Sequence, residues 1–347
     1  MRVINICCNY GSYKDGIGAY SKKMTEAILR QNHNINIDTI TSDIADYGKI
    51  KRVLSLKMTK NLFKAYRLIN KEKVDILNIE YPFTEWNPCI IIPYSLLAKR
   101  CKKNEVTLFI SLHEYARTNS LRKKIIRYLV KRADKVFVTE ETMKQQLKVL
   151  NPNIHIRHIP SNIQITKEKN IETKEKNQFV FFGLINKSKA FDEMIEAWKQ
   201  FQSDNKECKL LILTSSNIEI EKANEYNIDL MKNLNDDQIE DMMSKSTYCV
   251  LPIRPDVNFN NATLKTSCMF NCIPIGKFNE QLERQCDFII NMKDYTINDF
   301  KDGFNKALHI ENIKQKQEEA EKFGSQFDIN NIAKEILNVY NERRKYE

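Results

Sequence analysis

The sequence lacks a run of apolar residues long enough to cross a lipid bilayer. A transmembrane helix needs about 20 such residues, and the longest apolar stretch, residues 88–98, is roughly half that length. The first residues, MRVINICCNYGS, lead straight into a predicted strand and lack the apolar core of a cleavable signal peptide. We therefore expect a cytoplasmic protein, with a peripheral position on the cytoplasmic face of the inner membrane as the alternative.

The sequence also lacks a Cys-x-x-Cys pair. It contains 9 cysteines, an odd number, and most of them lie in apolar strand or helix contexts: Cys7, Cys8, Cys89, Cys101, Cys208, Cys249, Cys268, Cys272 and Cys286. This pattern is typical of buried thiols in a reducing compartment, and it argues against a zinc site.

Acidic residues are scarce in the first half of the chain. Residues 1–165 hold 29 Lys and Arg against 14 Asp and Glu, whereas the remaining residues carry a slight acidic excess. The formal net charge of the whole chain is +10. A basic half of this kind suits an anionic partner, and the composition leaves open whether the partner is a membrane surface or a nucleic acid.

The length of the chain and the order of its predicted elements indicate two domains. The 347 residues exceed the ~100–150 residues of an ordinary compact domain. Strands and helices alternate in both halves, which predicts an α/β protein with two doubly wound parallel-sheet (Rossmann-like) domains facing across a cleft. We expect an N-terminal domain over 1–163, a charged linker over 164–178, a C-terminal domain over 179–328, and a helix over 329–347 that packs back on the first domain.

One strand–loop–helix segment in the second half carries the strongest signal of a ligand site. The apolar run 179–182 predicts a buried parallel strand, which breaks at Gly183 into a polar loop with Asn186, Lys187 and Lys189. A helix with apolar positions at helical spacing follows at once. Lysines and free backbone N–H groups before a helix suit a phosphate, and the alternative is an ordinary turn with solvated lysines.

Further strands and helices complete the second half. Strands are predicted over 209–213, 228–231, 248–252 and 273–276, and helices over 218–227, 236–245 and 263–270. Because ligands bind beyond the carboxyl ends of parallel strands, Thr214 and the polar loop 253–261 lie where such a ligand would be expected.

A glycine-containing loop follows the first predicted strand, residues 3–8. Gly11, Gly16 and Gly18 would let the backbone turn tightly and approach a nucleotide or a sugar closely. Their spacing departs from the Gly-x-Gly-x-x-Gly fingerprint, so an ordinary tight turn explains them equally well.

Residues 121–134 predict a basic amphipathic helix. Apolar side chains, including Leu121, Ile125 and Ile126, would line one face, while Lys and Arg crowd the rest. Such a helix can lie on a surface of anionic lipid. The alternative is a helix that packs on the sheet and leaves its basic face in water.

Several short motifs occur in an order that is moderately specific. Gly16-Ile17-Gly18 with Tyr20 comes first, Phe182-Gly183 with Lys189-Ala190-Phe191 comes next, and Leu251-Pro252 and Ile273-Pro274-Ile275 follow. Together they resemble the motifs of GT-B glycosyltransferases, in particular the family 4 enzymes of bacterial surface polysaccharide synthesis. The resemblance covers nearly the whole chain. It implies a retaining enzyme that moves a sugar from a nucleotide sugar to a saccharide acceptor in capsule, exopolysaccharide or O-antigen synthesis.

The chain also departs from the pattern of that family. The family has an Arg before the Lys that helps to bind the donor diphosphate, and Leu184 stands at the matching position. The family's two glutamates, of which the second usually holds the donor ribose, correspond to Phe259 and Ser267. A glycosyltransferase-like binding or scaffold protein that has lost catalysis is therefore the alternative function.

The resemblance and the local signals together give a set of expected site residues. We expect Lys189 and His113 to be catalytic, with Lys189 on the departing diphosphate. The donor side would also include Gly16, Gly18, Gly183, Asn186, Lys187, Thr214, Arg254, Asn260, Asn261, Thr263, Lys265 and Ser267. The acceptor side would include Tyr13, Glu80, Glu114 and Arg117.

The chain has no Asp-x-Asp motif, so we expect neither a metal ion nor another cofactor. The resemblance implies a lipid-linked saccharide acceptor, and an anionic membrane surface is expected to meet residues 121–134. A nucleic acid is not expected as a partner, because the basic residues lack interleaved aromatic side chains and a recognised binding module.

Overall fold

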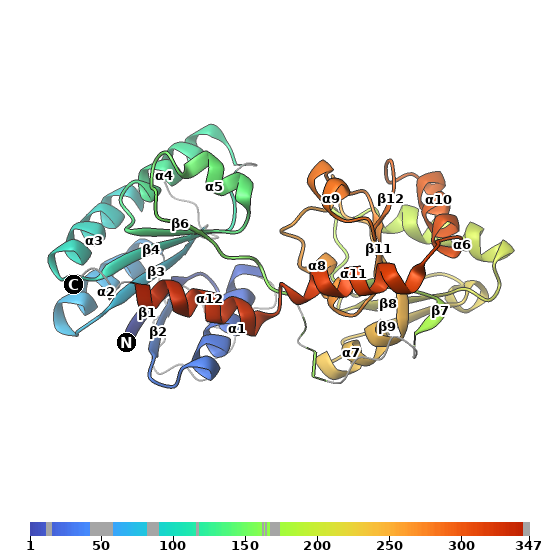
Figure 1. Cartoon of the computed structure of the whole chain (residues 1–347), viewed down its shortest axis with the longest axis horizontal. Helices are drawn as coiled ribbons and strands as arrows, with labels where there is room; N and C mark the ends of the chain where they lie inside the picture. Colours follow the sequence, from blue (N-terminus) through green and yellow to red (C-terminus); the bar gives the residue numbers. More distant parts are fainter. Residues whose placement is uncertain are drawn as a thin grey trace. The chain divides into compact units, whose positions relative to one another are not determined.

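The computed structural model describes residues 1–11, 16–41, 58–81, 90–115, 118–161, 163, 165–166 and 174–342. The chain forms two compact units (Figure 1). Unit 1 consists of Met1–Ile159 together with Ile329–Glu347, and unit 2 consists of Pro160–Asp328.

Unit 1 contains a parallel sheet of six strands in the order β2-β1-β3-β4-β5-β6. The strands are β1 (Arg2–Cys7), β2 (Asn36–Thr41), β3 (Ile76–Tyr81), β4 (Thr107–Leu112), β5 (Lys135–Val138) and β6 (Ile154–Ile156). The helices are α1 (Gly16–Gln31), α2 (Met58–Lys71), α3 (Ile91–Lys103), α4 (Ser120–Val130), α5 (Glu141–Leu147) and α12 (Ile329–Asn341).

Helices cover both faces of this sheet because its strands alternate between two apolar clusters. Side chains of α2, α3, α4 and α5 pack with strand residues such as Ile4, Leu77 and Ile110. Side chains of α1 and α12 pack with the opposite set, which includes Val3 and Phe109. The last helix of the chain therefore completes the core of the first unit.

Unit 2 contains a second parallel sheet of six strands, in the order β12-β11-β10-β7-β8-β9. The strands are β7 (Glu175–Phe182), β8 (Lys209–Thr214), β9 (Ile228–Lys232), β10 (Ser246–Leu251), β11 (Ile273–Gly276) and β12 (Ile290–Asn291). The helices are α6 (Phe191–Asp204), α7 (Asp236–Lys245), α8 (Ala262–Met269), α9 (Glu280–Gln285), α10 (Ile297–Leu308) and α11 (Ile313–Ser325). Helices α6 and α10 lie against one face, and α7, α8 and α11 against the other.

The predicted fold class is confirmed: both units are α/β, each with a parallel Rossmann-like sheet, and the C-terminal helix returns to the first unit. In unit 2 the strands follow the 3-2-1-4-5-6 order that is typical of dinucleotide-binding sheets. The connection after β7 therefore leads toward the β9 edge of the sheet, and the connection after β10 leads toward the β12 edge.

Two local predictions were wrong. Strand β7 begins at Glu175, inside the segment expected to be a linker, because residues before the apolar run still pair with β10. The helix expected over 218–227 is only a 3-10 turn, Ala223–Tyr226. The residues that flank this turn, Lys222 and Asn227, have left-handed backbone conformations that end any regular helix.

Candidate functional site

The strongest candidate site lies in unit 2, beyond the carboxyl ends of β7 and β10. In an open parallel sheet, ligands bind where the connections of two adjacent strands diverge, because helix N-termini and loop N–H groups point there. The loop after β7 begins at Gly183, whose N–H donates to the carbonyl of Leu213 at 3.0 Å. The loop after β10 runs to Asn261, where α8 begins.

Gly183, Lys189 and Thr263 converge at this point. The backbone of Gly183 has a φ of +127°, which disfavours any side chain. A Cβ placed on Gly183 would lie 3.0 Å from Nζ of Lys189 and 3.8 Å from Oγ1 of Thr263. An ammonium and a hydroxyl thus border a space that glycine keeps open.

Backbone contacts and an aromatic ring hold Lys189 in place. Lys189 forms an antiparallel β-bridge with Ile253, and its backbone N–H donates to the carbonyl of Asn186 at 3.0 Å. The ammonium lies 4.7 Å from the ring centroid of Phe181. Among the residues that the structure describes, it has no hydrogen-bond or ion-pair partner. Burial lowers the pKa of Lys189 to about 8. A partly desolvated cation of this kind gains strongly from an anion.

The first turn of α8 faces the same space. Asn261 caps this helix, because its side chain accepts a hydrogen bond from the N–H of Leu264 at 2.7 Å. Thr263 lies in the turn that this cap fixes, and the N–H of Asn260 donates to Asn258 at 3.0 Å just before it. The helix therefore presents its positive end beside Lys189.

Arg254 lies beside the same loop but already has a partner. Its N–H donates to the carbonyl of Ser188 at 2.9 Å, and its guanidinium is 2.5 Å from the carboxylate of Glu193 in the first turn of α6. Both side chains of this ion pair are well exposed, at 45% and 36%. The sequence had indicated Arg254, whereas Glu193 was missed as its partner.

The remaining donor-side predictions have two outcomes. Asn186 and Lys187 are exposed in the loop, and Asn186 Oδ1 accepts hydrogen bonds from Ser188. Thr214 ends β8, where its hydroxyl accepts from the N–H of Ser216 at 3.0 Å. Asn186 and Lys187 lie on the loop that borders the site, and Thr214 lies at the end of the neighbouring strand β8.

Lys265 and Ser267 are instead fully buried in the interior. The ammonium of Lys265 lies 4.3 Å from the ring centroid of Phe327, and the hydroxyl of Ser267 donates to the carbonyl of Leu264 at 2.7 Å. The structure does not bring them to Lys189, because α8 turns these positions toward the core. Phe259, the other position at which the family carries a glutamate, packs on Phe323.

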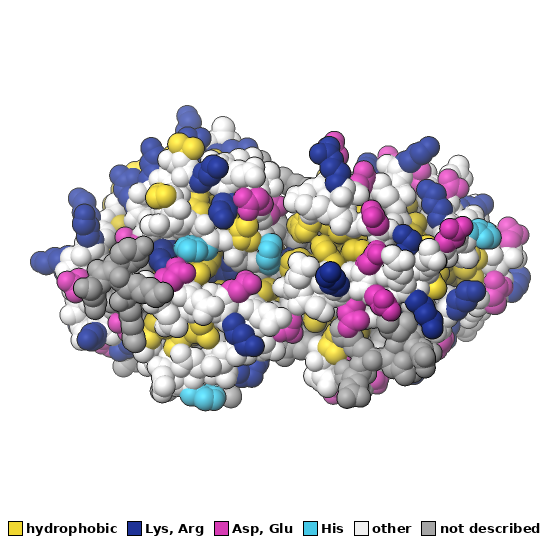
Figure 2. Space-filling view, in the orientation of Figure 1, with side chains coloured by type: hydrophobic (Ala, Val, Ile, Leu, Met, Phe, Trp, Pro, Cys, Tyr) yellow, Lys and Arg dark blue, Asp and Glu magenta, His cyan; other side chains and the backbone are white. Residues whose placement is uncertain are grey.

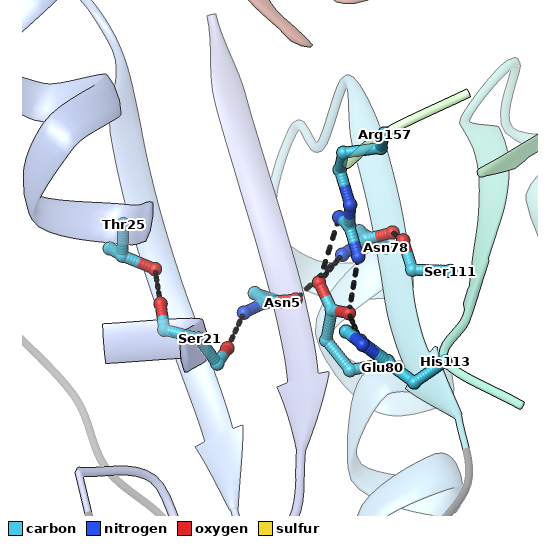
Figure 3. A network of polar contacts seen from close by, with 8 residues as sticks. All are labelled: Asn5, Ser21, Thr25, Asn78, Glu80, Ser111, His113 and Arg157. Atoms are coloured by element: carbon cyan, nitrogen blue, oxygen red, sulfur yellow. Dashed lines mark hydrogen bonds and ion pairs between the residues drawn. The ribbon is translucent and has the colours of Figure 1, made fainter. Parts of the chain in front are cut away.

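A second polar cluster lies in unit 1, at the carboxyl ends of β1, β3 and β4 (Figure 3). Its centre is the buried carboxylate of Glu80. Arg157 donates to both oxygens, to Oε1 at 3.1 Å and to Oε2 at 2.7 Å. Asn78 donates to Oε1 at 2.8 Å, and Nε2 of His113 lies 2.7 Å from Oε2. The cluster continues through Asn5 to Ser21 on α1.

Charge and aromatic rings stabilise this cluster. Burial alone would raise the pKa of Glu80, but the charge of Arg157 and the hydrogen bond with His113 outweigh it and lower the pKa to about 2. The guanidinium of Arg157 lies 5.2 Å from the ring of Tyr20 and 5.1 Å from the ring of Phe137. Glu80 is therefore an ionised carboxylate that is buried and hydrogen-bonded to donors of the protein.

This setting changes the expected role of Glu80. The sequence suggested that Glu80 orients an acceptor hydroxyl, but its carboxylate is buried and its donors come from the protein. Glu114 lies just beyond β4, where its carboxylate is 2.7 Å from Arg122. Tyr13 and Arg117 lie outside the described residues.

The glycines of the first loop serve local packing. Gly16 begins α1. A Cβ on Gly18 would lie 2.0 Å from the carbonyl oxygen of Asn9, and the carbonyl of Gly18 accepts from the N–H of Gly11 at 2.9 Å. The backbone at Gly18 lies so close to that at Asn9 that a side chain at position 18 would clash, so glycine is required there.

Arg157 was missed by the sequence reasoning, as were Asn5, Ser21 and Asn78. Arg157 follows the short strand β6 and pairs with a carboxylate 77 positions earlier in the chain. The available signal was an arginine directly after an apolar strand, but nothing local identified its partner.

The described residues contain no cluster of three or more His, Cys, Asp or Glu side chains that could hold a metal ion. No helix in this part of the chain is long and apolar enough to span a membrane.

No protein-family model and no curated protein matches the sequence, but solved structures match its fold. A glycosyltransferase from Rickettsia africae ESF-5 aligns with a TM-score of 0.72 at 12% identity, over 100% of this chain and 99% of that one. A candidate UDP-N-acetylglucosamine 2-epimerase from Listeria monocytogenes gives 0.68 at 10%, over 100% and 97%. An α-glucosyltransferase in complex with UDP and a 13-mer DNA gives 0.63 at 16%, over 98% and 99%.

These similarities extend over both units of the chain. At such low identities they establish the fold, which is the GT-B fold that the motifs had suggested. Membership of family 4 stays a prediction.

Proposed function

We propose that the protein is a glycosyltransferase that uses a nucleotide sugar, with UDP as the first nucleotide to test. The observation that carries this proposal is the convergence of Gly183, Lys189 and Thr263 beyond the central strands of unit 2. The names of the structural neighbours support the choice of UDP, because two of them include it.

The geometry suits a departing diphosphate. When a sugar leaves its nucleotide, negative charge develops on the diphosphate, and a fixed cation or a helix N-terminus stabilises that charge. Lys189 would supply the cation, while Thr263 and the first turn of α8 would supply hydrogen bonds. Because the protein provides this charge itself, we propose transfer that does not depend on a metal ion. Retention of the anomeric configuration follows from the resemblance to family 4.

We propose a lipid-linked saccharide as the acceptor, in the synthesis of capsule, exopolysaccharide or O-antigen. In the view of Figure 2, Lys and Arg side chains are spread over both units. The excess of 29 Lys and Arg over 14 Asp and Glu in residues 1–165 would attract an anionic membrane to the enzyme. Most apolar side chains of α4 are not available to lipid, because Ile125, Ile126, Leu129 and Val130 are buried in the core, whereas Leu121 is 50% exposed. The exposed basic residues of α4 and of the turn after it, Lys124, Arg127, Lys131 and Arg132, would therefore act mainly through charge.

A binding protein without transferase activity is the second candidate. Its specific support is the use of Phe259 and Ser267 for internal packing, where the family carries glutamates. Such a protein would bind the nucleotide through Lys189 but would not turn over the sugar.

A thermal-shift panel tests the proposed donor site. UDP, GDP, CMP, ADP, dTDP and their common sugar conjugates would be compared, because a ligand at 100 times its Kd stabilises the folded state by about 2.7 kcal/mol. We expect one nucleotide to stabilise the wild type and the Lys206→Ala variant, but not Lys189→Ala. Lys206 is the control lysine, since it is exposed just after the C-terminal end of α6 and is not among the expected site residues. A panel without any shift would contradict the donor site, and binding without transfer would favour the second candidate.

Sedimentation with anionic vesicles tests the membrane surface. Each basic residue near such a surface contributes about 1 kcal/mol. We expect Lys124→Gln with Arg127→Gln to weaken binding by roughly tenfold or more. Lys206→Gln with Lys245→Gln removes the same charge from exposed positions of unit 2 and is the control. Equal binding of both double variants would refute a role for α4.

A further inference from the structure

A small polar cavity lies inside unit 1, between the sheet and the helices α1 and α12. Polar side chains of β1, β3, α1 and α12 line it together with Arg157, and apolar side chains form the rest of the wall. The space open to the centre of a water molecule is about 20 Å³. A buried water needs about 10–15 Å³ on this measure. The cavity therefore has room for one water molecule and is too small for a sugar or a nucleotide.

Tyr340 of α12 lines this cavity with a hydroxyl that lacks a partner. The residue is 4% exposed, and its ring packs on the rings of Phe109 and Phe137, with centroids 5.2 Å and 6.3 Å apart. Within the described residues its hydroxyl makes no hydrogen bond. Burial raises the pKa of Tyr340 and the charge of Arg157 opposes this rise, which indicates that the hydroxyl lies near the guanidinium. A buried hydroxyl without a hydrogen bond is unfavourable.

Arg157 brings further donors to the same cavity. A guanidinium has five N–H groups, and two of those of Arg157 donate to Glu80. The other three have no hydrogen-bond partner in the part of the chain that the structure describes. Since the side chain is only 4% exposed, bulk solvent has little access to them. A molecule that accepts a hydrogen bond in the cavity would satisfy at least one of these donors.

Thr25 of α1 supplies an acceptor in the wall of the cavity. Its hydroxyl donates its proton to the carbonyl of Ser21 at 2.8 Å (Figure 3). The lone pairs of Oγ1 therefore stay available to a donor. The lining thus combines donors from Arg157 and Tyr340 with an acceptor from Thr25.

We propose that the cavity binds one structural water molecule, which accepts hydrogen bonds from Arg157 and Tyr340 and donates one to Oγ1 of Thr25. Buried waters typically make about three hydrogen bonds to polar groups that would otherwise lack a partner. This water connects α1 and α12 with the buried cluster around Glu80, and it stabilises the packing of the last helix on unit 1. The proposal does not depend on the transferase function.

A crystal structure of the ligand-free protein tests the site directly. We expect density for one water in the cavity, at about 2.7–3.2 Å from both the guanidinium of Arg157 and the hydroxyl of Tyr340. A cavity without density, or a water that does not contact both groups, would overturn the proposal.

Two tyrosine variants test the site in solution. Tyr20 is the matched control, because its hydroxyl is buried in the same core without a partner among the described residues, and Tyr20 is not among those that line the cavity. Tyr340→Phe removes a partner of the water and should lower the midpoint of urea denaturation. Tyr20→Phe removes an unpaired hydroxyl and should leave the midpoint unchanged or raise it. If Tyr340→Phe does not lower the midpoint either, its hydroxyl has no water partner and the proposal fails.

A double variant tests whether Tyr340 and Thr25 share one water. Thr25→Val removes the acceptor with little change of shape and should lower the urea midpoint on its own. Once either partner is lost the water is held weakly, so the double variant should lose less than the sum of the two single losses. Additive losses would show that the two hydroxyls have no common partner and would contradict the proposal.

Discussion

Replacing Arg157 with methionine should destabilise unit 1 strongly, because it leaves Glu80 as a buried carboxylate without its cation. Both side chains of this pair are only 4% exposed. Breaking such a pair by removing one partner typically costs about 3–5 kcal/mol. The lowered pKa of Glu80 supports a cost of this magnitude. The difference between its ordinary pKa of 4.5 and about 2 corresponds to roughly 3 kcal/mol.

The loss of stability caused by Arg157→Met should depend on pH. In the wild type the pKa of Glu80 is lowered, so its stabilising contribution is present above pH 4.5 and is lost as the pH falls toward about 2. Without Arg157, burial would raise the pKa of Glu80, and protonation would then relieve the variant. The loss of stability should therefore be smaller at pH 5 than at pH 7.

Urea denaturation followed by far-UV circular dichroism measures both effects. The control is Arg254→Met, which breaks an exposed Arg–Glu pair in unit 2 and should cost only about 0–1 kcal/mol. If Arg157→Met costs no more than this control, or if its cost does not shrink at pH 5, the reasoning about the buried cluster is refuted.

Three further predictions concern unit 2. Gly183→Ala should weaken UDP binding at least tenfold in calorimetry, since a φ of +127° strains any residue with a side chain and the methyl group would displace the Lys189 ammonium, 3.0 Å from its position. Unchanged affinity would exclude this loop as the site. Lys189→Met should abolish UDP binding while raising Tm by a few degrees. The lowering of the Lys189 pKa from 10.5 to about 8 means that the charged ammonium destabilises the folded protein by at most about 3 kcal/mol, and methionine removes that cost. A lower Tm in scanning calorimetry would be inconsistent with this reasoning. Tyr295→Phe should cost about 1 kcal/mol in urea denaturation and weaken UDP binding several-fold, because its hydroxyl donates to the carbonyl of Ile253 at 2.5 Å, and full affinity would show that this bond does not shape the site.

Local signals in the sequence were sufficient to predict the elements that carry the proposed donor site. The apolar run before Gly183, the polar loop and the acidic first turn of α6 are contiguous, so the strand, the loop and Lys189 could all be predicted. Thr263 was found because Asn261 marks a helix start. These features depend on neighbours in the chain rather than on tertiary contacts.

Tertiary contacts explain what the sequence did not reveal. Lys265 and Ser267 lie on the side of α8 that packs into the core. Because both side chains are polar, nothing in the sequence indicated that they would be buried. The pairing of Arg157 with Glu80 joins distant strands. Within 277–328, which was assigned only to the C-terminal domain, no strand or helix was predicted, although this segment forms β12 and helices α9, α10 and α11.

Calorimetric titration with UDP at pH 7 and pH 9 tests most directly whether the ammonium of Lys189 holds the diphosphate. With a pKa of about 8, Lys189 is mostly charged at pH 7 and mostly neutral at pH 9. We expect the affinity of the wild type to fall about tenfold between these pH values, and that of Lys189→Arg to change little, because a guanidinium stays charged. The same fall in both proteins, or no binding of UDP by the wild type at pH 7, would contradict the account.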